Sequence, residues 1–350
     1  MTKQEETSIF VEQYGRQLPA AYTDFRSEYS AATTAAGIYD SSYIGRLKAI
    51  GEDGLDLLNR MSTNKVIDLG IGEGAVTVLT TDRGRIVDVL SVVNQGDYRL
   101  LLTSPGQQQP VIDWLDKYTI LEDLVIEDIS TDTSMLSVIG PKAAELVGLS
   151  PHQFSQDSLT IQSVTMNGID TLAIGQPLGS LSRYWLIVRP DDFVGLWQHL
   201  EERGASPIGA NAVNAIRINY GIPEYGPELG EPYNPLEAGL IGSVDFTKGC
   251  YIGQEVIARL DSYKKVKRRL VTLTFDNGAA VSSGDELEQD GQPVGRVTSV
   301  APESSDGVLK GLGYVKANNA SPGSKLTITG NHKVSADILS LVQPYGPAKD

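Results

Sequence analysis

The chain has 350 residues, of which 41% are hydrophobic, and this suits a well-cored protein of two or three domains. The formal net charge of −15 argues against a surface that neutralises nucleic-acid phosphates in bulk. A single cysteine cannot form an intrachain disulfide, and neither a secretory signal nor an apolar run of about 18 residues is present. We therefore expect a cytoplasmic protein with no membrane span and no direct nucleic-acid binding.

The three histidines are also informative, because they are too widely scattered to form a ligand cluster. They lie at His152, His199 and His332, without acidic residues or cysteine at metal-ligand spacing. We expect no permanently bound metal.

Residues 1–130 carry the pattern of a first α+β unit. Apolar spacing predicts helices over 22–36, 53–61 and 107–118. Strand patterns cover 44–50, 75–80 and 85–93, and the turn residues 94–97 lead into a further strand over 98–103. These strands predict an antiparallel sheet.

Residues 131–263 repeat this plan. Strands are predicted over 134–139 and 184–188, and helices after Pro141, after Pro190 and over 210–219. In both stretches a strand precedes a helix with a tryptophan next to a hydrophobic residue, at Trp114 and Trp197. This gives limited support for two related α+β units.

The end of the chain, residues 264–345, has the pattern of a small all-β barrel or sandwich. Short strands are predicted at regular spacing, over 270–275, 286–289, 295–300, 311–315 and 325–328. A basic run from Lys264 to Arg269 precedes them. This run is either a solvated hinge between domains or a basic binding site for an anionic ligand tail or RNA.

The octapeptide 248–255, K-G-C-Y-I-G-Q-E, is the main functional candidate. It contains Cys250, the chain's single cysteine, between Gly249 and Gly253, which permit a tight turn or a close approach to a ligand. Lys248 places a cation near the thiol and would favour the reactive thiolate. The alternative is a buried cysteine that acts as a small hydrophobic residue in a glycine-rich turn.

This octapeptide resembles the K-G-C-Y-x-G-Q-E signature of the YgfZ family, folate-binding proteins tied to iron–sulfur cluster maintenance and tRNA modification. YgfZ proteins are related to the T proteins of the glycine cleavage system, and the likeness to T proteins extends over nearly the whole chain. A-G-I-Y-D at 36–40 resembles their A-G-M-F-D entry, Asn64 falls in their T/A-N-D segment, and G-R-I-V-D at 84–88 resembles their G-G-x-I-D-D strand.

The resemblance implies a fold and a ligand. The expected fold is α+β, with two ferredoxin-like units and a C-terminal all-β barrel arranged as a three-domain ring around a folate channel. The first two units interleave in sequence, so a boundary near residue 130 is approximate. The expected cofactor is tetrahydrofolate or a one-carbon-loaded folate.

Two positions depart from the T-protein pattern. The T proteins have two adjacent aspartates where this chain has Asp88 followed by Val89, and one of the two carboxylates assists transfer of the one-carbon unit. Neighbouring residues on a strand face opposite sides, so the orientation of Asp88 decides whether a carboxylate is retained at the site. The pterin-binding glutamate of the T proteins falls on or near Leu186.

The resemblance also implies site residues. Cys250, Lys248 and Asp88 are the candidate catalytic residues. The candidate folate contacts are Asn64, Asp88, Arg217, Tyr225 and Tyr251. Within the motif, Gln254 and Glu255 would order the loop, and Arg259 lies one helical turn beyond Glu255. An interdomain salt bridge is the alternative role for Arg217.

Two functions follow from these observations. The sequence favours a tetrahydrofolate-binding, YgfZ-like protein that supports iron–sulfur cluster assembly or repair through the Cys250 thiol, with assembly or client proteins as partners. The alternative is an aminomethyltransferase of the T-protein type that transfers a one-carbon unit to tetrahydrofolate, with Asp88 as its proton-handling residue.

Overall fold

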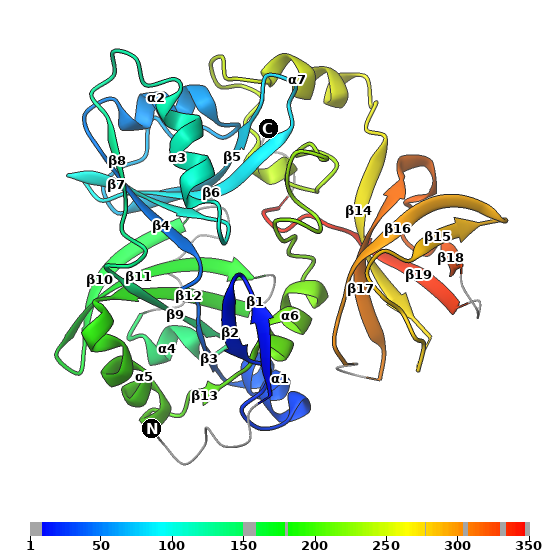
Figure 1. Cartoon of the computed structure of the whole chain (residues 1–350), viewed down its shortest axis with the longest axis horizontal. Coiled ribbons are helices and arrows are strands. Elements are labelled where there is room, and N and C mark those ends of the chain that lie inside the picture. The colour runs from blue at the N-terminus through cyan, green and yellow to red at the C-terminus, as the bar shows by residue number, and fades with distance from the viewer. Residues whose placement is uncertain are drawn as a thin grey trace. The chain divides into compact units, whose positions relative to one another are not determined.

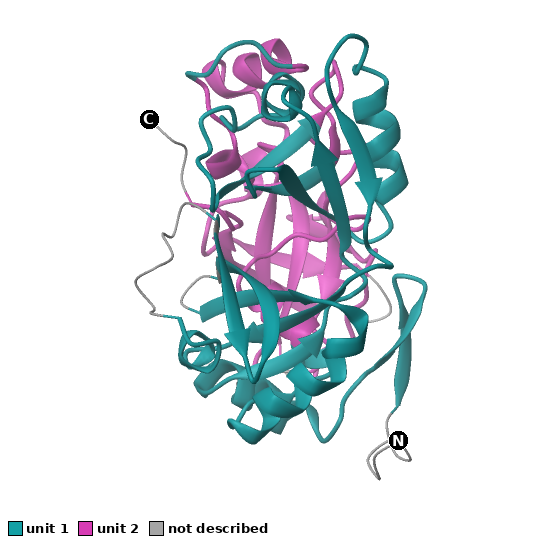
Figure 2. Cartoon of the chain, turned by 90° about the vertical axis from the view of Figure 1, so that its left-hand side faces the viewer, with its two compact units in different colours: residues 1–79, 88–212, 247–251 teal, residues 80–87, 213–246, 252–350 magenta. Residues whose placement is uncertain are grey.

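The computed structural model describes residues 9–149, 159–178, 181–276, 278–303, 307–329 and 334–346. The chain divides into two compact units, shown in Figure 2. Unit 1 comprises residues 1–79, 88–212 and 247–251, and unit 2 comprises residues 80–87, 213–246 and 252–350. Each unit is therefore assembled from segments that are distant in sequence.

Among the described residues, unit 1 is built on an 11-stranded sheet in the order β13-β3-β9-β12-β11-β10-β5-β6-β7-β4-β8. In chain order, the strands are β3 (Gly37–Asp40), β4 (Gly45–Ile50), β5 (Glu73–Thr80), β6 (Ile86–Asn94), β7 (Tyr98–Thr103), β8 (Val125–Asp128), β9 (Ser134–Ile139), β10 (Leu159–Met166), β11 (Ile169–Leu178), β12 (Leu181–Val188) and β13 (Ser206–Pro207). A separate hairpin, β1 (Phe10–Gln13) and β2 (Arg16–Pro19), precedes this sheet.

The helices of unit 1 pack on this sheet. Helix α1 (Phe25–Thr34) contacts β3, α3 (Gln108–Asp116) contacts β4, α4 (Ala143–Leu146) contacts β12, and α5 (Phe193–Glu202), which follows the short η2 (Pro190–Asp192), contacts β9 (Figure 1). Helix α2 (Gly54–Met61) buries Leu55, Leu58 and Met61, the apolar positions that recur at helical spacing. Residues 210–212 of unit 1 begin α6 (Ala210–Asn219).

One face of the sheet carries an apolar group that we call the inner cluster. Its members come from β6, β7, β9, β10, β11 and β12, and they are Val93, Leu100, Leu102, Met135, Leu159, Ile174, Trp185 and Ile187. This cluster therefore joins residues from strands of both halves of the sheet.

Unit 2 contains a closed barrel in the order β14-β17-β16-β15-β18-β19 (Figure 1). The strands are β14 (Arg268–Phe275), β15 (Glu286–Gln289), β16 (Gln292–Val300), β17 (Leu309–Lys316), β18 (Lys325–Ile328) and β19 (Val334–Leu341). Unit 2 also holds most of α6, the helix α7 (Gln254–Ser262) and the short turns η3 (Ile241–Ser243) and η4 (Ala317–Asn319). The predicted α+β fold with a C-terminal all-β barrel is confirmed.

Several observed strands are absent from the sequence-based expectation, among them two hairpins and β19. The β10–β11 hairpin turns at Asn167-Gly168, which both have positive φ, a turn that Asn-Gly typically forms. The β1–β2 hairpin turns similarly at Tyr14-Gly15. Strand β19 pairs with β14 and β18 and thereby closes the barrel.

Candidate functional site

Lys248 is a buried anchor for the cysteine loop. Its side chain is 7% exposed, and its ammonium donates hydrogen bonds to the backbone carbonyls of Asn59 at 2.6 Å, Ser62 at 2.8 Å and Asn64 at 2.7 Å. An ammonium has three N–H donors, and three carbonyls accept them. The geometry therefore supports an anchoring role for Lys248, and its predicted action on the Cys250 thiol stays a prediction.

Cys250 and Tyr251 differ sharply in exposure. Cys250 is a free, exposed cysteine, so the alternative of a buried core thiol is wrong. Tyr251 is 8% exposed, and the Lys248 ammonium lies 5.1 Å from the centre of its ring in a cation–π contact. The Cys250 thiol is thus exposed to solvent on a loop that is anchored by the buried Lys248 and Tyr251.

The second half of the motif lies in unit 2 and starts helix α7. Gly253 is the residue before the helix and has a φ of +83°, and a Cβ atom there would lie 2.5 Å from the Thr81 carbonyl oxygen. Glu255 and Arg259 form the expected (i, i+4) ion pair at 2.6 Å on the exposed side of α7. Gly253 is therefore required by backbone geometry as well as by local packing.

Asn64 is buried, and its side chain is engaged with its own unit. The amide nitrogen Nδ2 donates to the Val76 carbonyl at 2.8 Å, and Oδ1 accepts from the Lys65 N–H at 2.9 Å. Its backbone N–H donates to Thr77 Oγ1 at 2.8 Å. These contacts, together with the bond from Lys248, give Asn64 a structural role; its predicted contact with folate stays a prediction.

Asp88 on β6 is fully buried. Its Oδ2 accepts a hydrogen bond from the Ser104 N–H at 3.0 Å, while within the described residues Oδ1 accepts none. Burial raises the pKa of this carboxyl from 3.8 to about 7, against the opposing effect of the hydrogen bonds from Ser104. Asp88 therefore changes its protonation state near neutral pH.

Strand alternation places Asp88 and Val89 on opposite faces of the sheet. Asp88 shares a buried face with Ile86 and Leu90, whereas Val89 shares the other face with Val93, a member of the inner cluster. The position that corresponds to the second T-protein aspartate, and that faces the inner cluster, is therefore apolar in this chain.

Leu186, like Val89, lies in apolar surroundings. It is fully buried in a second core that includes Tyr184, Val188 and Leu196, on the face of β12 opposite Trp185. A carboxylate at this position would lack a polar partner in that core.

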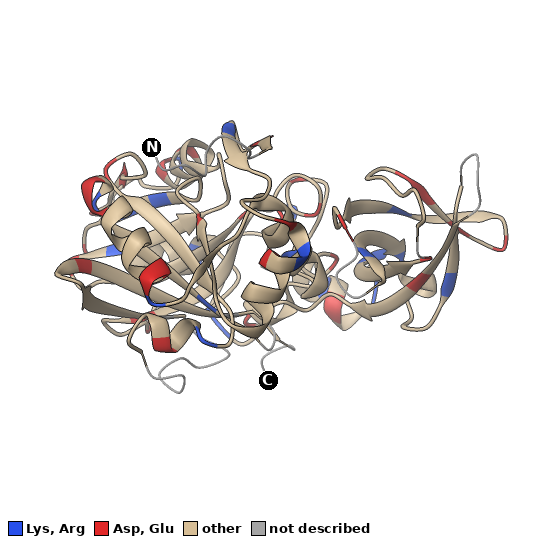
Figure 3. Ribbon diagram, turned by 90° about the horizontal axis from the view of Figure 1, so that it is seen from below, with Lys and Arg blue, Asp and Glu red and all other residues tan. Residues whose placement is uncertain are grey.

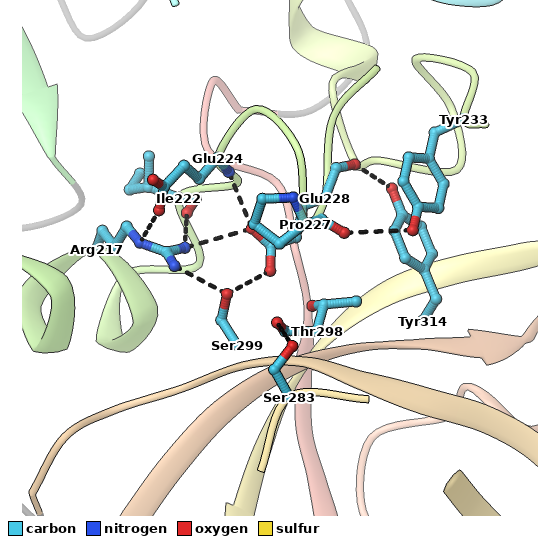
Figure 4. A network of polar contacts seen from close by, with 10 residues as sticks. All are labelled: Arg217, Ile222, Glu224, Pro227, Glu228, Tyr233, Ser283, Thr298, Ser299 and Tyr314. Atoms are coloured by element: carbon cyan, nitrogen blue, oxygen red, sulfur yellow. Dashed lines mark hydrogen bonds and ion pairs between the residues drawn. The ribbon is translucent and has the colours of Figure 1, made fainter. Parts of the chain in front are cut away.

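Arg217 at the end of α6 lies in a buried polar network of unit 2 (Figure 4). Its Nε lies 2.8 Å from Glu224 Oε2, and its Nη1 lies 3.4 Å from Oε2 of Glu228, which is fully buried. Ser299 completes the network, since its hydroxyl accepts from Arg217 Nη2 at 2.8 Å and donates to Glu228 Oε1 at 2.6 Å. Arg217 therefore forms salt bridges within unit 2, and not the interdomain salt bridge given as its alternative role.

Tyr225, the remaining predicted folate contact, lies in the loop after this network. It is partly buried and forms an isolated bridge with Leu229. Gly230 lies against its ring, so that a Cβ atom there would be 3.7 Å from the ring carbons.

The basic run is partly engaged within unit 2. Lys264 pairs with Asp261 at 3.4 Å. The guanidinium of Arg268 lies over the stacked rings of Tyr233 and Tyr314 and pairs with Glu237 at 3.4 Å. Figure 3 shows acidic and basic residues interspersed along the ribbon. Arg268 therefore fits neither of the two predicted roles, a solvated hinge or a basic site free to bind an anion.

Two polar side chains of unit 1 were not among the residues predicted from sequence. Gln176 on β11 and Trp185 on β12 are 3% and 6% exposed, and in the described part of the chain neither Gln176 Oε1 nor Trp185 Nε1 has a hydrogen-bond partner. Such an unpaired buried group costs about 1–3 kcal/mol. No sequence signal marked either residue, because both lie in runs that resemble ordinary strands.

Comparison with known proteins decides the family. The GCVT N-terminal domain matches residues 2–248, and the glycine cleavage T-protein C-terminal barrel domain matches residues 268–342. The chain belongs to the GCVT family. A solved GCVT structure, the glycine cleavage system aminomethyltransferase T of Bartonella henselae, has the same fold, with a TM-score of 0.84 over 98% of this chain and 96% of that one at 19% identity.

Two other GCVT relatives have named activities. A candidate chloroplastic transferase of Arabidopsis thaliana is 33% identical over 88% of this chain and 71% of that protein. An aminomethyltransferase of Symbiobacterium thermophilum is 28% identical over 90% of this chain and 87% of that protein. These names support the transferase hypothesis better than the iron–sulfur hypothesis that the sequence favoured.

The described residues also bear on metal binding and membrane insertion. The described residues contain no group of three or more His, Cys, Asp or Glu side chains arranged to hold a metal ion. None of the helices in the described ranges has the length and apolar character needed to span a bilayer.

Proposed function

We propose that this chain is a folate-dependent transferase of the GCVT type, which transfers a one-carbon unit to tetrahydrofolate. The observation that supports this most directly is the match of both GCVT domains, which together cover residues 2–248 and 268–342. Relatives with transferase names over most of the chain add to it.

Asp88 is the residue of this chain that we propose for proton handling. Among the predicted folate contacts, Asn64 and Arg217 already bond to protein groups, whereas Oδ1 of Asp88 accepts no hydrogen bond from the described residues. A carboxyl with a pKa of about 7 can accept or release a proton near neutral pH. When bound, tetrahydrofolate would supply the amines that receive the one-carbon unit.

The direct experiment combines the protein with tetrahydrofolate, an aminomethylated lipoyl carrier and the other glycine-cleavage components. We expect methylenetetrahydrofolate to form above background, and Asp88→Asn to lower its rate by about 100-fold. Asp116→Asn, which changes an exposed carboxylate on α3, is the matched control and should leave the rate unchanged. No product from the wild-type protein would exclude this reaction.

Folate binding is tested separately by thermal or chemical unfolding. A ligand at about 100 times its dissociation constant adds roughly 2.7 kcal/mol to the free energy of unfolding. An unchanged unfolding transition with both mono- and polyglutamylated tetrahydrofolate would remove the premise of the proposal.

A second candidate function is support of iron–sulfur proteins through Cys250. Two observations favour it: the exposed thiol on a loop anchored by Lys248, and the apolar Val89 where the T proteins have a second carboxylate. One cysteine cannot hold a cluster by itself, so a partner protein would supply the other ligands. The test is deletion of the gene, followed by assays of iron–sulfur enzymes; full complementation by Cys250→Ala would exclude a thiol role.

A further inference from the structure

Strand β8 forms one edge of the unit 1 sheet, and its outer side is open. In the described part of the chain it is the last strand of the sheet and pairs only with β4. The Ile129 N–H donates to the Arg46 carbonyl at 2.9 Å, so every second residue of this antiparallel ladder is bonded to β4. Ile126 and Asp128 lie between the bonded positions, so their N–H and C=O groups point away from β4, and no described residue bonds to them. Such a row of unpaired backbone groups can pair with an added strand.

The loop that precedes β8 holds two large apolar side chains in solvent. Leu121 is 95% exposed and Ile120 is 82% exposed, the two highest values among the large apolar residues of the described ranges. Glu122 fixes the loop, because its Oε2 accepts from the Ile120 N–H at 2.8 Å and from the Leu121 N–H at 3.1 Å. Its other oxygen, Oε1, pairs with Arg60 at 2.9 Å. The loop therefore presents Ile120 and Leu121 outward in a defined position, next to the open edge, as interaction sites do.

Charge indicates which kind of strand fits this edge. Four of the seven residues from 122 to 128 are acidic: Glu122, Asp123, Glu127 and Asp128. Lys48 lies opposite Glu127 on β4, but its ammonium lies over the Tyr98 ring. A second copy of this chain would bring the same carboxylates together, and each chain has a formal net charge of −15. Because like charges that face each other destabilise a strand pair, the edge favours a basic partner over a second copy.

We infer that residues 120–128 form a docking site for an extended, basic segment of a partner protein, which adds a strand to β8. The main chain of this segment would bond to the open groups of Ile126 and Asp128. Its Lys or Arg side chains would lie beside the carboxylates, and its apolar residues would cover Ile120 and Leu121. The site contains none of the residues proposed for folate binding, so it does not depend on the proposed function.

Three synthetic octapeptides test the chemistry of the partner. The first alternates lysine and valine, the second has glutamate in place of lysine, and the third is the lysine peptide with its four central amides N-methylated. We expect calorimetry to show binding of the lysine peptide, and binding at least about 10-fold weaker for the other two. Equal binding of the glutamate peptide would contradict the choice of a basic partner, and equal binding of the N-methylated peptide would contradict strand addition. No binding of the lysine peptide at about 1 mM would also overturn the inference.

Variants of the protein locate the site. The double variant Ile120→Ser, Leu121→Ser removes the apolar contacts, and Ile126→Pro removes an N–H that points away from β4. Each should weaken binding of the lysine peptide by about 10-fold, whereas Ile71→Ser, which changes a side chain that is 77% exposed elsewhere in unit 1, should bind as the wild type does. If Ile126→Pro does not fold, the double variant still decides, and wild-type affinity in it would overturn the inference. A dimer of the wild type that the double variant does not form would assign this edge to a second copy and would equally overturn it.

Hydrogen exchange followed by NMR observes the added strand directly. The amides of Ile126 and Asp128 should exchange rapidly in the free protein and at least about 10-fold more slowly when the protein is saturated with the lysine peptide. The Glu127 amide is the internal control, because it lies on the β4 side of the ladder and should exchange slowly in both states. Unchanged exchange of Ile126 and Asp128 in the saturated complex would refute the inference.

Discussion

Replacing Asp88 with asparagine is expected to remove a pH dependence of stability. Asp88 is fully buried, and burial raises its pKa to about 7 in the folded protein from 3.8. Well below pH 4 the carboxyl is protonated in both the folded and the unfolded protein, so its burial does not lower the free energy of unfolding through ionisation. As the pH rises from 4 to 7, the unfolded chain ionises while the folded protein keeps its proton, so the free energy of unfolding falls.

The size of this change in the free energy of unfolding follows from the difference of about three between the folded and unfolded pKa values. At about 1.4 kcal/mol for each pKa unit, it amounts to roughly 4 kcal/mol. The assay is urea unfolding of the wild type and Asp88→Asn at several pH values from 5 to 8. The free energy of unfolding of the variant minus that of the wild type should increase with pH and level off above pH 7. Other titrating groups are common to both proteins and cancel in this difference.

Asp116→Asn again serves as the control, because it makes the same chemical change at an exposed carboxylate. A flat difference for Asp88→Asn between pH 5 and 8 would refute the argument that burial holds this carboxyl neutral. A difference that falls with pH would show that the folded protein stabilises the charged form instead.

Three further substitutions test the anchors of the fold. Lys248→Met should lower the free energy of unfolding by about 3 kcal/mol, because three buried carbonyls lose their donor, while the exposed Lys325→Met should have little effect in the same urea titration. Gly253→Ala should cost about 1–3 kcal/mol, since its φ is +83° and the added Cβ meets a carbonyl oxygen at 2.5 Å; Gly249→Ala has open space and should be close to neutral, and an equal loss for both would contradict the strain argument. Glu228→Gln should lower the thermal midpoint through a loss of about 3 kcal/mol, because it removes the buried charge that pairs with Arg217, and an unchanged midpoint would show that the network contributes nothing to stability.

Local sequence patterns were sufficient for much of the secondary structure. The predicted helix over 210–219 and the predicted strands over 286–289 and 325–328 match α6, β15 and β18 residue for residue. Apolar periodicity and turn residues act over a few neighbouring positions, so they are visible in sequence. The β10–β11 hairpin was missed although Asn167-Gly168 marks its turn, because the flanking runs show little alternation.

The candidate site was only partly accessible to such patterns. The sequence singled out Lys248, Cys250 and Asp88, and the ion pair of Glu255 with Arg259 follows from helical spacing alone. What each of the first three does depends on contacts made by distant segments. The carbonyls that bind Lys248 lie 184 to 189 residues away along the chain, and they give Lys248 an anchoring role that its neighbours in sequence do not indicate.

Asp88 and the pair of Gln176 and Trp185 show the same limit. Sequence alone left open the face of the sheet on which Asp88 lies, and alternation along β6 places it on the face opposite the inner cluster. Exposure and unpaired polar atoms exist only once strands from several parts of the chain lie together. The sequence by itself therefore determined the elements, the barrel and the motif, whereas tertiary structure decided protonation, burial and partners, because desolvation and hydrogen bonding depend on neighbours in space.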